Sequence, residues 1–98
     1  MTASSRAYET AIALIKSPEA DATIEVVTAA DPDAEVIDRG SYLHLRSPND
    51  ITVNMNDVAE ELGEDIALSR WLVVMSTYTG RIITGDDFIT FTAELPEG

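Results

Sequence analysis

The residue types that could support chemistry are few in this chain. His44 is the only histidine, and the 98 residues include no cysteine, which excludes thiolate nucleophiles, iron–sulfur clusters, disulfides and cysteine zinc sites. A single histidine also cannot supply a paired Glu-x-x-His iron site or a His-rich zinc site within one chain. Because no motif of a nucleophile, base and orienting acid surrounds it, His44 is predicted to be a surface or partner-facing residue.

The carboxylates are abundant but follow no catalytic or metal-binding pattern. Glu60, Glu61, Glu64 and Asp65 form one cluster, yet this cluster lacks the alternating oxygen ligands and the glycine of a calcium loop. We interpret it as a solvated acidic helix end. Most glycines stand singly, so no phosphate-binding loop is present. The sequence therefore assigns no catalytic, cofactor-binding or metal-binding residue.

Composition indicates one small acidic globular domain spanning residues 1–98, with residues 1–9 expected to form a flexible tail. Six basic residues against 18 acidic ones give a net charge of −12, which argues against nucleic acid or an anionic membrane as partner and favours a basic or mixed-charge protein surface. No apolar run is long enough for a signal peptide or a membrane span, so the protein is predicted to be cytoplasmic.

The elements that must position any functional residues begin with a buried strand over Thr10–Ile15. Ser17-Pro18-Glu19 is a strong helix start, because serine can cap, proline fits the first helical position and acids favour the positive end of the helix. Asp31-Pro32 ends that helix, which is predicted over residues 18–30.

A β-hairpin is predicted over Glu35–Arg46, with a two-residue turn at Arg39-Gly40 that would pair Ile37 with Tyr42. A short strand over 51–53 and a helix from the cap at Asn54 to 62–63 come next.

The segment 66–73 is predicted to be a short helix or irregular turn, within which Trp71 serves either the core or an interface. Strands over 75–84 and 88–95 form a C-terminal hairpin. The apolar residues of its second strand alternate with polar ones: Ile89, Phe91, Ala93 and Leu95. These elements predict an α+β fold of two sheet-bearing halves that share one core.

Two stretches, EVIDRGSYLHLRSP at 35–48 and LSRWLVVMSTYTGRIITGDDFITFTAEL at 68–95, follow Asp31-Pro32-Asp33 and flank NMNDVAEELG. Together, in this order and spacing, they resemble the effector proteins, also called coupling or regulatory proteins, of bacterial soluble diiron monooxygenases. The relatives serve methane, phenol, toluene, propane and alkene monooxygenases. The resemblance covers Thr10 to Leu95.

The resemblance implies a noncatalytic, cofactorless protein that docks on the diiron hydroxylase over the helices around the iron centre. There it would modulate oxygen activation, substrate access and the coupling of NADH use to oxygenation, with the reductase as an indirect partner or competitor. The resemblance also assigns hydroxylase-facing residues in two blocks. They are Arg39 and Tyr42 in the hairpin, and Val74, Ser76, Thr77, Tyr78, Thr79, Gly80 and Arg81 in the later segment.

Other interpretations stay open at this point. A small acidic domain that binds a metabolite would need a concave apolar pocket, and a mimic of nucleic acid would need carboxylates at phosphate-like spacing along one face. Within the later block, Tyr78 could be a core residue and Arg81 a solvated charge.

We expect the purified protein to bind no iron, flavin or nucleotide, because it lacks the ligand set that each requires. Elemental analysis and the absorption spectrum after mild chelation measure this. Stoichiometric metal or a bound chromophore would contradict the assignment.

Overall fold

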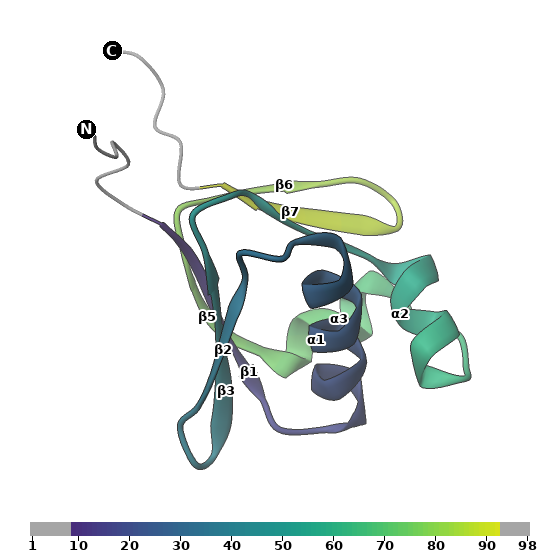
Figure 1. Cartoon of the computed structure of the whole chain (residues 1–98). Helices are drawn as coiled ribbons and strands as arrows, with labels where there is room; N and C mark the ends of the chain where they lie inside the picture. The colour runs from purple at the N-terminus through teal and green to yellow at the C-terminus, as the bar shows by residue number, and fades with distance from the viewer. Residues whose placement is uncertain (1–8, 93–98) are drawn as a thin grey trace, which may run out of the picture.

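The computed structural model describes residues 9–92, which form two antiparallel sheets and three helices around a common core (Figure 1). In chain order the elements are β1 (Thr10–Ile15), α1 (Pro18–Ala30), β2 (Glu35–Asp38), β3 (Tyr42–Ser47), β4 (Ile51–Asn54), α2 (Met55–Leu62), α3 (Leu68–Val74), β5 (Met75–Thr79), β6 (Arg81–Thr84) and β7 (Phe88–Thr92). The larger sheet has the order β2-β3-β1-β5 and the smaller one β4-β7-β6. The α+β prediction is confirmed.

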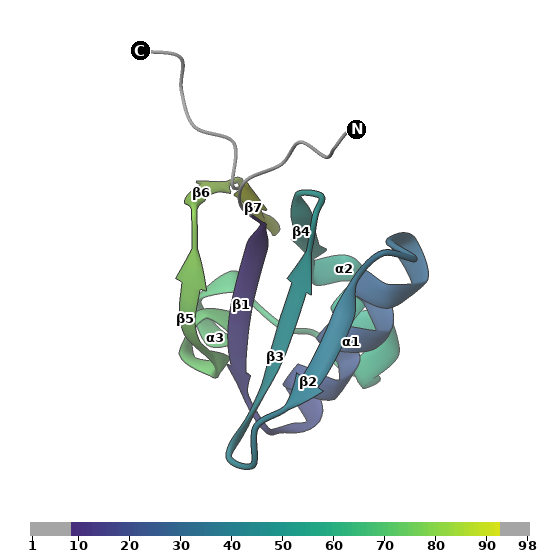
Figure 2. The same ribbon diagram turned by 60° about the vertical axis from the view of Figure 1, so that its left-hand side comes forward.

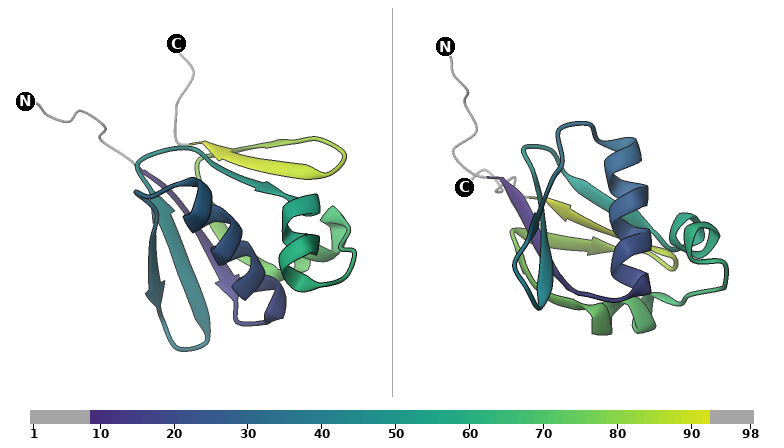
Figure 3. Two further views of the ribbon diagram at one scale, coloured as in Figure 1. Left: turned by 45° about the vertical axis from the view of Figure 1, so that its right-hand side comes forward. Right: turned by 60° about the horizontal axis from the view of Figure 1, so that its bottom comes forward.

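Local capping signals set the first two helices where the sequence predicted them. The Ser17 hydroxyl accepts a hydrogen bond from the Ala20 N–H at 3.1 Å, and Pro18 opens α1. The Asn54 side chain caps α2 by accepting from the Asn56 N–H at 2.8 Å, and Gly63 ends it with a φ of 86°. The two helices lie side by side, with α1 next to the larger sheet and α2 farther from it, against α1 and β4 (Figure 3).

The predicted hairpin forms, but its predicted register is wrong. Ile37 pairs with His44 and not with Tyr42, because the two turn residues are Gly40-Ser41 and the Arg39 N–H donates to the Tyr42 carbonyl at 2.9 Å. Of the two turn residues only Gly40 has a positive φ, at 91°, as in a hairpin turn with glycine at its first central position. Since the error shifts each partner by two residues, every side chain stays on its expected face.

The segment 75–84 is also not one strand as predicted. Gly80 adopts a φ of 98°, a conformation that favours glycine, and the chain turns there from β5 in the larger sheet to β6 in the smaller one. β6 and β7 form the expected hairpin, in which Ile89 and Phe91 are buried. Ala93 and Leu95 lie outside the described residues, as does most of the expected N-terminal tail.

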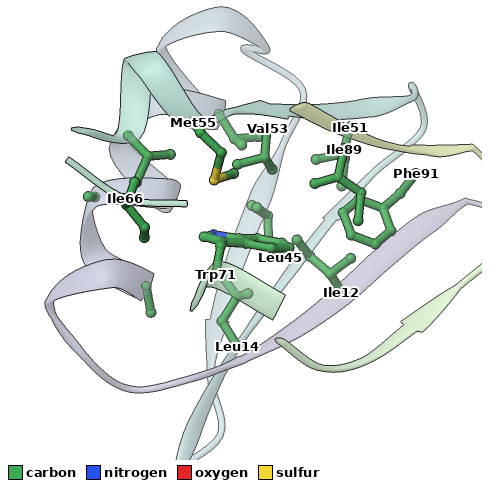
Figure 4. Close-up of a cluster of buried hydrophobic side chains, with 14 residues drawn as sticks. Ile12, Leu14, Leu45, Ile51, Val53, Met55, Ile66, Trp71, Ile89 and Phe91 are labelled. Atoms are coloured by element: carbon green, nitrogen blue, oxygen red, sulfur yellow. The ribbon is translucent and has the colours of Figure 1, made fainter. Parts of the chain in front are cut away.

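The core lies between the helices and both sheets, with Trp71 at its centre (Figure 4). Trp71 is fully buried, and its indole N–H donates to the Thr23 hydroxyl at 2.8 Å. Its ring packs on Phe91 with centroids 6.1 Å apart. Of the two roles open for Trp71 from sequence, the structure gives the core.

None of the helices in the described part of the chain is long and apolar enough to cross a membrane.

We expect Gly40→Val to lower stability by about 1 to 3 kcal/mol, because a β-branched residue is strained at positive φ. Asp87→Ala removes one surface hydrogen bond, from the Asn56 amide at 3.0 Å, and should cost under about 1 kcal/mol. Urea denaturation of both variants measures the difference. Equal midpoints would show that the turn does not constrain residue 40.

Asp31 links the end of α1 to the turn after β3, and its hydrogen bonds make stability depend on acid. One carboxylate oxygen accepts from the Ser47 hydroxyl at 2.6 Å, and the other accepts from the Asn49 amide at 3.1 Å. The Ser47 hydrogen bond, helped by Asn49 and the backbone N–H of Asp33, lowers the pKa of Asp31 below its ordinary value against the opposing effect of desolvation. The carboxylate therefore stabilises the fold above its unfolded pKa, and this contribution is lost as the pH falls through the lower folded pKa.

We expect Asp31→Asn to lower the thermal midpoint at pH 7 and to lose less stability than the wild type on acidification below about pH 4. Asp50→Asn is the matched control, because the Asp50 carboxylate accepts no hydrogen bond from the described residues. Parallel curves of midpoint against pH for the wild type and Asp31→Asn would contradict this prediction.

Candidate functional site

The outer face of the larger sheet is bare. The helices pack on its inner face, and no other element of residues 9–92 covers the opposite side, which faces the viewer in Figure 2. Paired residues in neighbouring strands share a face, so the register identifies this outer surface. Ala13 lies between His44 and Thr77 across the strands, and Ala11 pairs with Thr79.

Three residues of the predicted site share this outer face. Tyr42 pairs with Ile15 at one end of β1, while Thr77 and Thr79 follow β5 toward the other end. The β1 residues in the middle of the face are Ala11 and Ala13, whose short side chains leave it shallow. The exposed hydroxyls of Thr77 and Thr79 line its edge on β5. The face can offer hydrogen bonds and shape, and its one imidazole, His44, stacks on Tyr42.

The β5 segment contains a β-bulge that the sequence did not reveal. Thr77 pairs with Ala13 and Met75 pairs with Leu14, so Ser76 is an extra residue on β5. A bulge twists the strand locally and redirects its side chains. This irregularity leaves Ser76 exposed on an edge strand.

Tyr78 is partly a core residue and partly a surface residue. It pairs with Ile12 on the inner side of the sheet, and its ring packs on Phe91 with centroids 5.7 Å apart. The side chain is nevertheless 43% exposed. The remaining members of the segment lie at its ends: Val74 is half-buried at the end of α3, and Gly80 and Arg81 make the turn into β6.

The structure does not bring all the predicted residues together. Arg39 is in the hairpin turn, beyond the end of the sheet where Tyr42 pairs with Ile15. Arg81 lies beyond the other end, where Thr79 pairs with Ala11. The two arginines therefore flank the bare face from opposite ends.

The two arginines also differ from the other cations of residues 9–92 in their pairing. Lys16 binds Asp38 at 2.8 Å, Arg46 binds Glu35 at 3.3 Å, and Arg70 binds Glu19 at 2.7 Å and Glu64 at 3.4 Å. Within the described chain, neither Arg39 nor Arg81 has a carboxylate within 4.0 Å. Both are exposed and free to pair with another molecule.

Two of these cations lower the pKa of the carboxylate that they contact. The Arg70 hydrogen bond lowers the pKa of Glu19, and the Lys16 hydrogen bond lowers the pKa of Asp38.

Exposed apolar side chains concentrate around the same segment. Leu72 and Val73 precede it, Tyr78 belongs to it, and Ile83 follows it. The others are Ile15 and Tyr42, paired with each other on the bare face, and Val36 at the far edge of the sheet. Sequence analysis missed Ile15, Leu72, Val73 and Ile83. For Leu72 and Val73 one signal was present, because no charged residue occurs between Arg70 and Arg81 in this strongly acidic chain. This signal does not extend to Ile15 or Ile83.

The rest of the described surface offers little for metal or small-molecule chemistry. No group of three or more histidines, aspartates or glutamates within residues 9–92 could hold a metal ion. His44 stacks on Tyr42 with ring centroids 6.5 Å apart. A hollow of about 370 Å³ near the end of α1 is lined partly by Asp31, Asp33 and Asp50, unlike the apolar pocket that metabolite binding would require.

Comparisons with known proteins agree with this fold. The chain is 32% identical over 69 residues to the effector subunit of the alkene monooxygenase system of Xanthobacter autotrophicus Py2, covering 68% of each. It superposes on a chain of a phenol hydroxylase–regulatory protein complex with a TM-score of 0.76 at 19% identity, covering 86% of this chain and 97% of that one. That likeness shows the fold alone.

The structure of the soluble methane monooxygenase regulatory protein B matches with a TM-score of 0.69 at 27% identity, covering 97% of this chain and 72% of that one. The model of the MmoB/DmpM family matches residues 9–92, the whole of the described region. This chain therefore belongs to the MmoB/DmpM family.

Proposed function

We propose that this protein is the noncatalytic effector of a multicomponent hydrocarbon monooxygenase, and that it binds the diiron hydroxylase through the bare sheet face and the 74–81 segment. One observation carries the proposal: exposed apolar side chains and the unpaired Arg81 gather around the segment that resembles the family's hydroxylase-facing block. The names of the relatives, an effector subunit and regulatory proteins, support it.

The surface has the chemistry of a protein interface. Such interfaces join an apolar centre to a polar rim, with tyrosine and arginine as frequent anchors. Here Tyr42 and Tyr78 are partly exposed, and Arg39 and Arg81 lie at the two ends of the face. Because neither arginine is ion-paired within residues 9–92, a carboxylate on the hydroxylase can pair with either without breaking an ion pair of that region.

The proposed mechanism acts through binding alone, because no motif of a nucleophile, base and orienting acid surrounds His44. A protein without a cofactor changes its partner's chemistry only by binding one state of that partner more tightly than another. Docking therefore favours a hydroxylase state that activates oxygen, admits substrate and couples NADH use to oxygenation. The reductase takes part indirectly or competes for the hydroxylase, and the complex is cytoplasmic.

We expect Arg81→Ala to weaken binding to the cognate hydroxylase by roughly tenfold or more, with an unchanged thermal midpoint, because no carboxylate of residues 9–92 lies within 4.0 Å of Arg81. Arg81→Lys keeps the charge and should retain part of the affinity. Tyr78→Ala should lower both affinity and stability, since its ring packs on Phe91. Affinity, thermal midpoint and product formed per NADH are the measurements.

The docking assignment fails if Arg81→Ala and Tyr78→Ala both keep wild-type affinity and coupling at subsaturating effector.

A further inference from the structure

Val73 is the most exposed large apolar side chain in the described part of the chain. It is 75% exposed, and the next, Ile15, is 48% exposed. Val73 lies in the last turn of α3, directly before β5. Neither the sequence resemblance nor the family match assigns it a role.

The packing of α3 fixes this exposure. Trp71 is fully buried, and its hydrogen bond to Thr23 sets the rotation of the helix about its axis. On the outside, the Arg70 guanidinium is held by Glu19 at 2.7 Å. Successive helical residues are about 100° apart, so Val73 points roughly opposite to Trp71.

Folding gives no reason for an apolar residue at this position. Valine has a lower helix propensity than most residues because its branched side chain loses rotamer freedom, and apolar surface left in water is not stabilised by burial. The first exposed residues of α3 are the polar Ser69 and Arg70, whereas the last are Leu72 and Val73. The helix thus becomes apolar on its outer side where it approaches β5.

Ile15, on the neighbouring strand β1, is a further exposed apolar residue near the start of β5. Leu14 pairs with Met75, and Ile15 is the next residue along β1, with Tyr42 as its partner on the other side. Leu72, Val73 and Ile15 therefore lie around the beginning of β5. We call Leu72 and Val73 of α3, together with Ile15 of β1, the α3 anchor.

We propose that the α3 anchor inserts into an apolar pocket of the hydroxylase and enlarges the docking surface beyond the 74–81 segment. This inference rests on the proposed function. Continuity with the bare sheet face and the lack of charge between Arg70 and Arg81 favour a protein pocket as occupant. The net charge of −12 opposes both a second copy of the chain and an anionic membrane.

The test compares Val73→Ser with Val36→Ser in binding to the cognate diiron hydroxylase. Val36 is a matched control, because it is an exposed valine, 41% accessible, on the far edge strand β2. We expect Val73→Ser to weaken binding by about tenfold with an unchanged thermal midpoint, and Val73→Ile to bind as the wild type does. Val36→Ser should bind as the wild type does.

Each other result overturns the inference. If the wild type binds and Val73→Ser binds equally well, the α3 anchor is wrong while the proposed function stands. If the wild type fails to bind, both fall. Two further experiments test other occupants of the α3 anchor. Sedimentation of the free protein would reveal a dimer, and binding to phosphatidylcholine vesicles would reveal a lipid complex. If Val73→Ser abolishes either one, the anchor serves self-association or lipid binding instead.

Discussion

The buried hydrogen bond between the Trp71 indole and the Thr23 hydroxyl joins the elements on which the rest of the fold depends. The Thr23 hydroxyl also donates to the Glu19 carbonyl at 2.8 Å, so it both donates and accepts a hydrogen bond. This buried hydroxyl is therefore satisfied in both roles. Trp71 packs on Phe91 of β7, which brings α1, α3 and the smaller sheet together at one side chain. Loss of the Thr23 hydroxyl would leave the indole N–H buried and unsatisfied, whereas after loss of Trp71 the Thr23 hydroxyl would keep its hydrogen bond to Glu19.

The proposed docking surface is attached to this core through aromatic contacts and through the chain itself. Phe91 touches Trp71 on one side and Tyr78 on the other, and α3 runs into β5 without an intervening loop. Meanwhile α1 and α2 carry no basic residue, so uncompensated acid lies on the helical side. Although the net charge is −12, the 71–80 segment carries no charged residue.

Local signals were sufficient for much of the fold. Ser17 and Pro18, and then Asn54 and Gly63, act within a few residues of the helix ends that they define, so both helices could be predicted. The turn register could not be predicted, because Gly40 fits either of two adjacent turns. The division of 75–84 between two sheets at Gly80 depends on partners distant in sequence.

The candidate site, too, could be predicted only in part. The segment around Tyr78 was identified through family resemblance. The bulge at Ser76 and the exposure of Val73 depend on pairing and helix rotation, which sequence does not show.

Trp71 is the only tryptophan in the chain, and its complete burial makes it an intrinsic spectroscopic probe. An indole shielded from water fluoresces at shorter wavelength than an exposed one, so the native emission should be blue-shifted and should move to the red on unfolding. A partner on the outer face of the sheet cannot quench this ring by collision. A shift of the Trp71 emission toward the red would therefore indicate that water reaches the core of this protein.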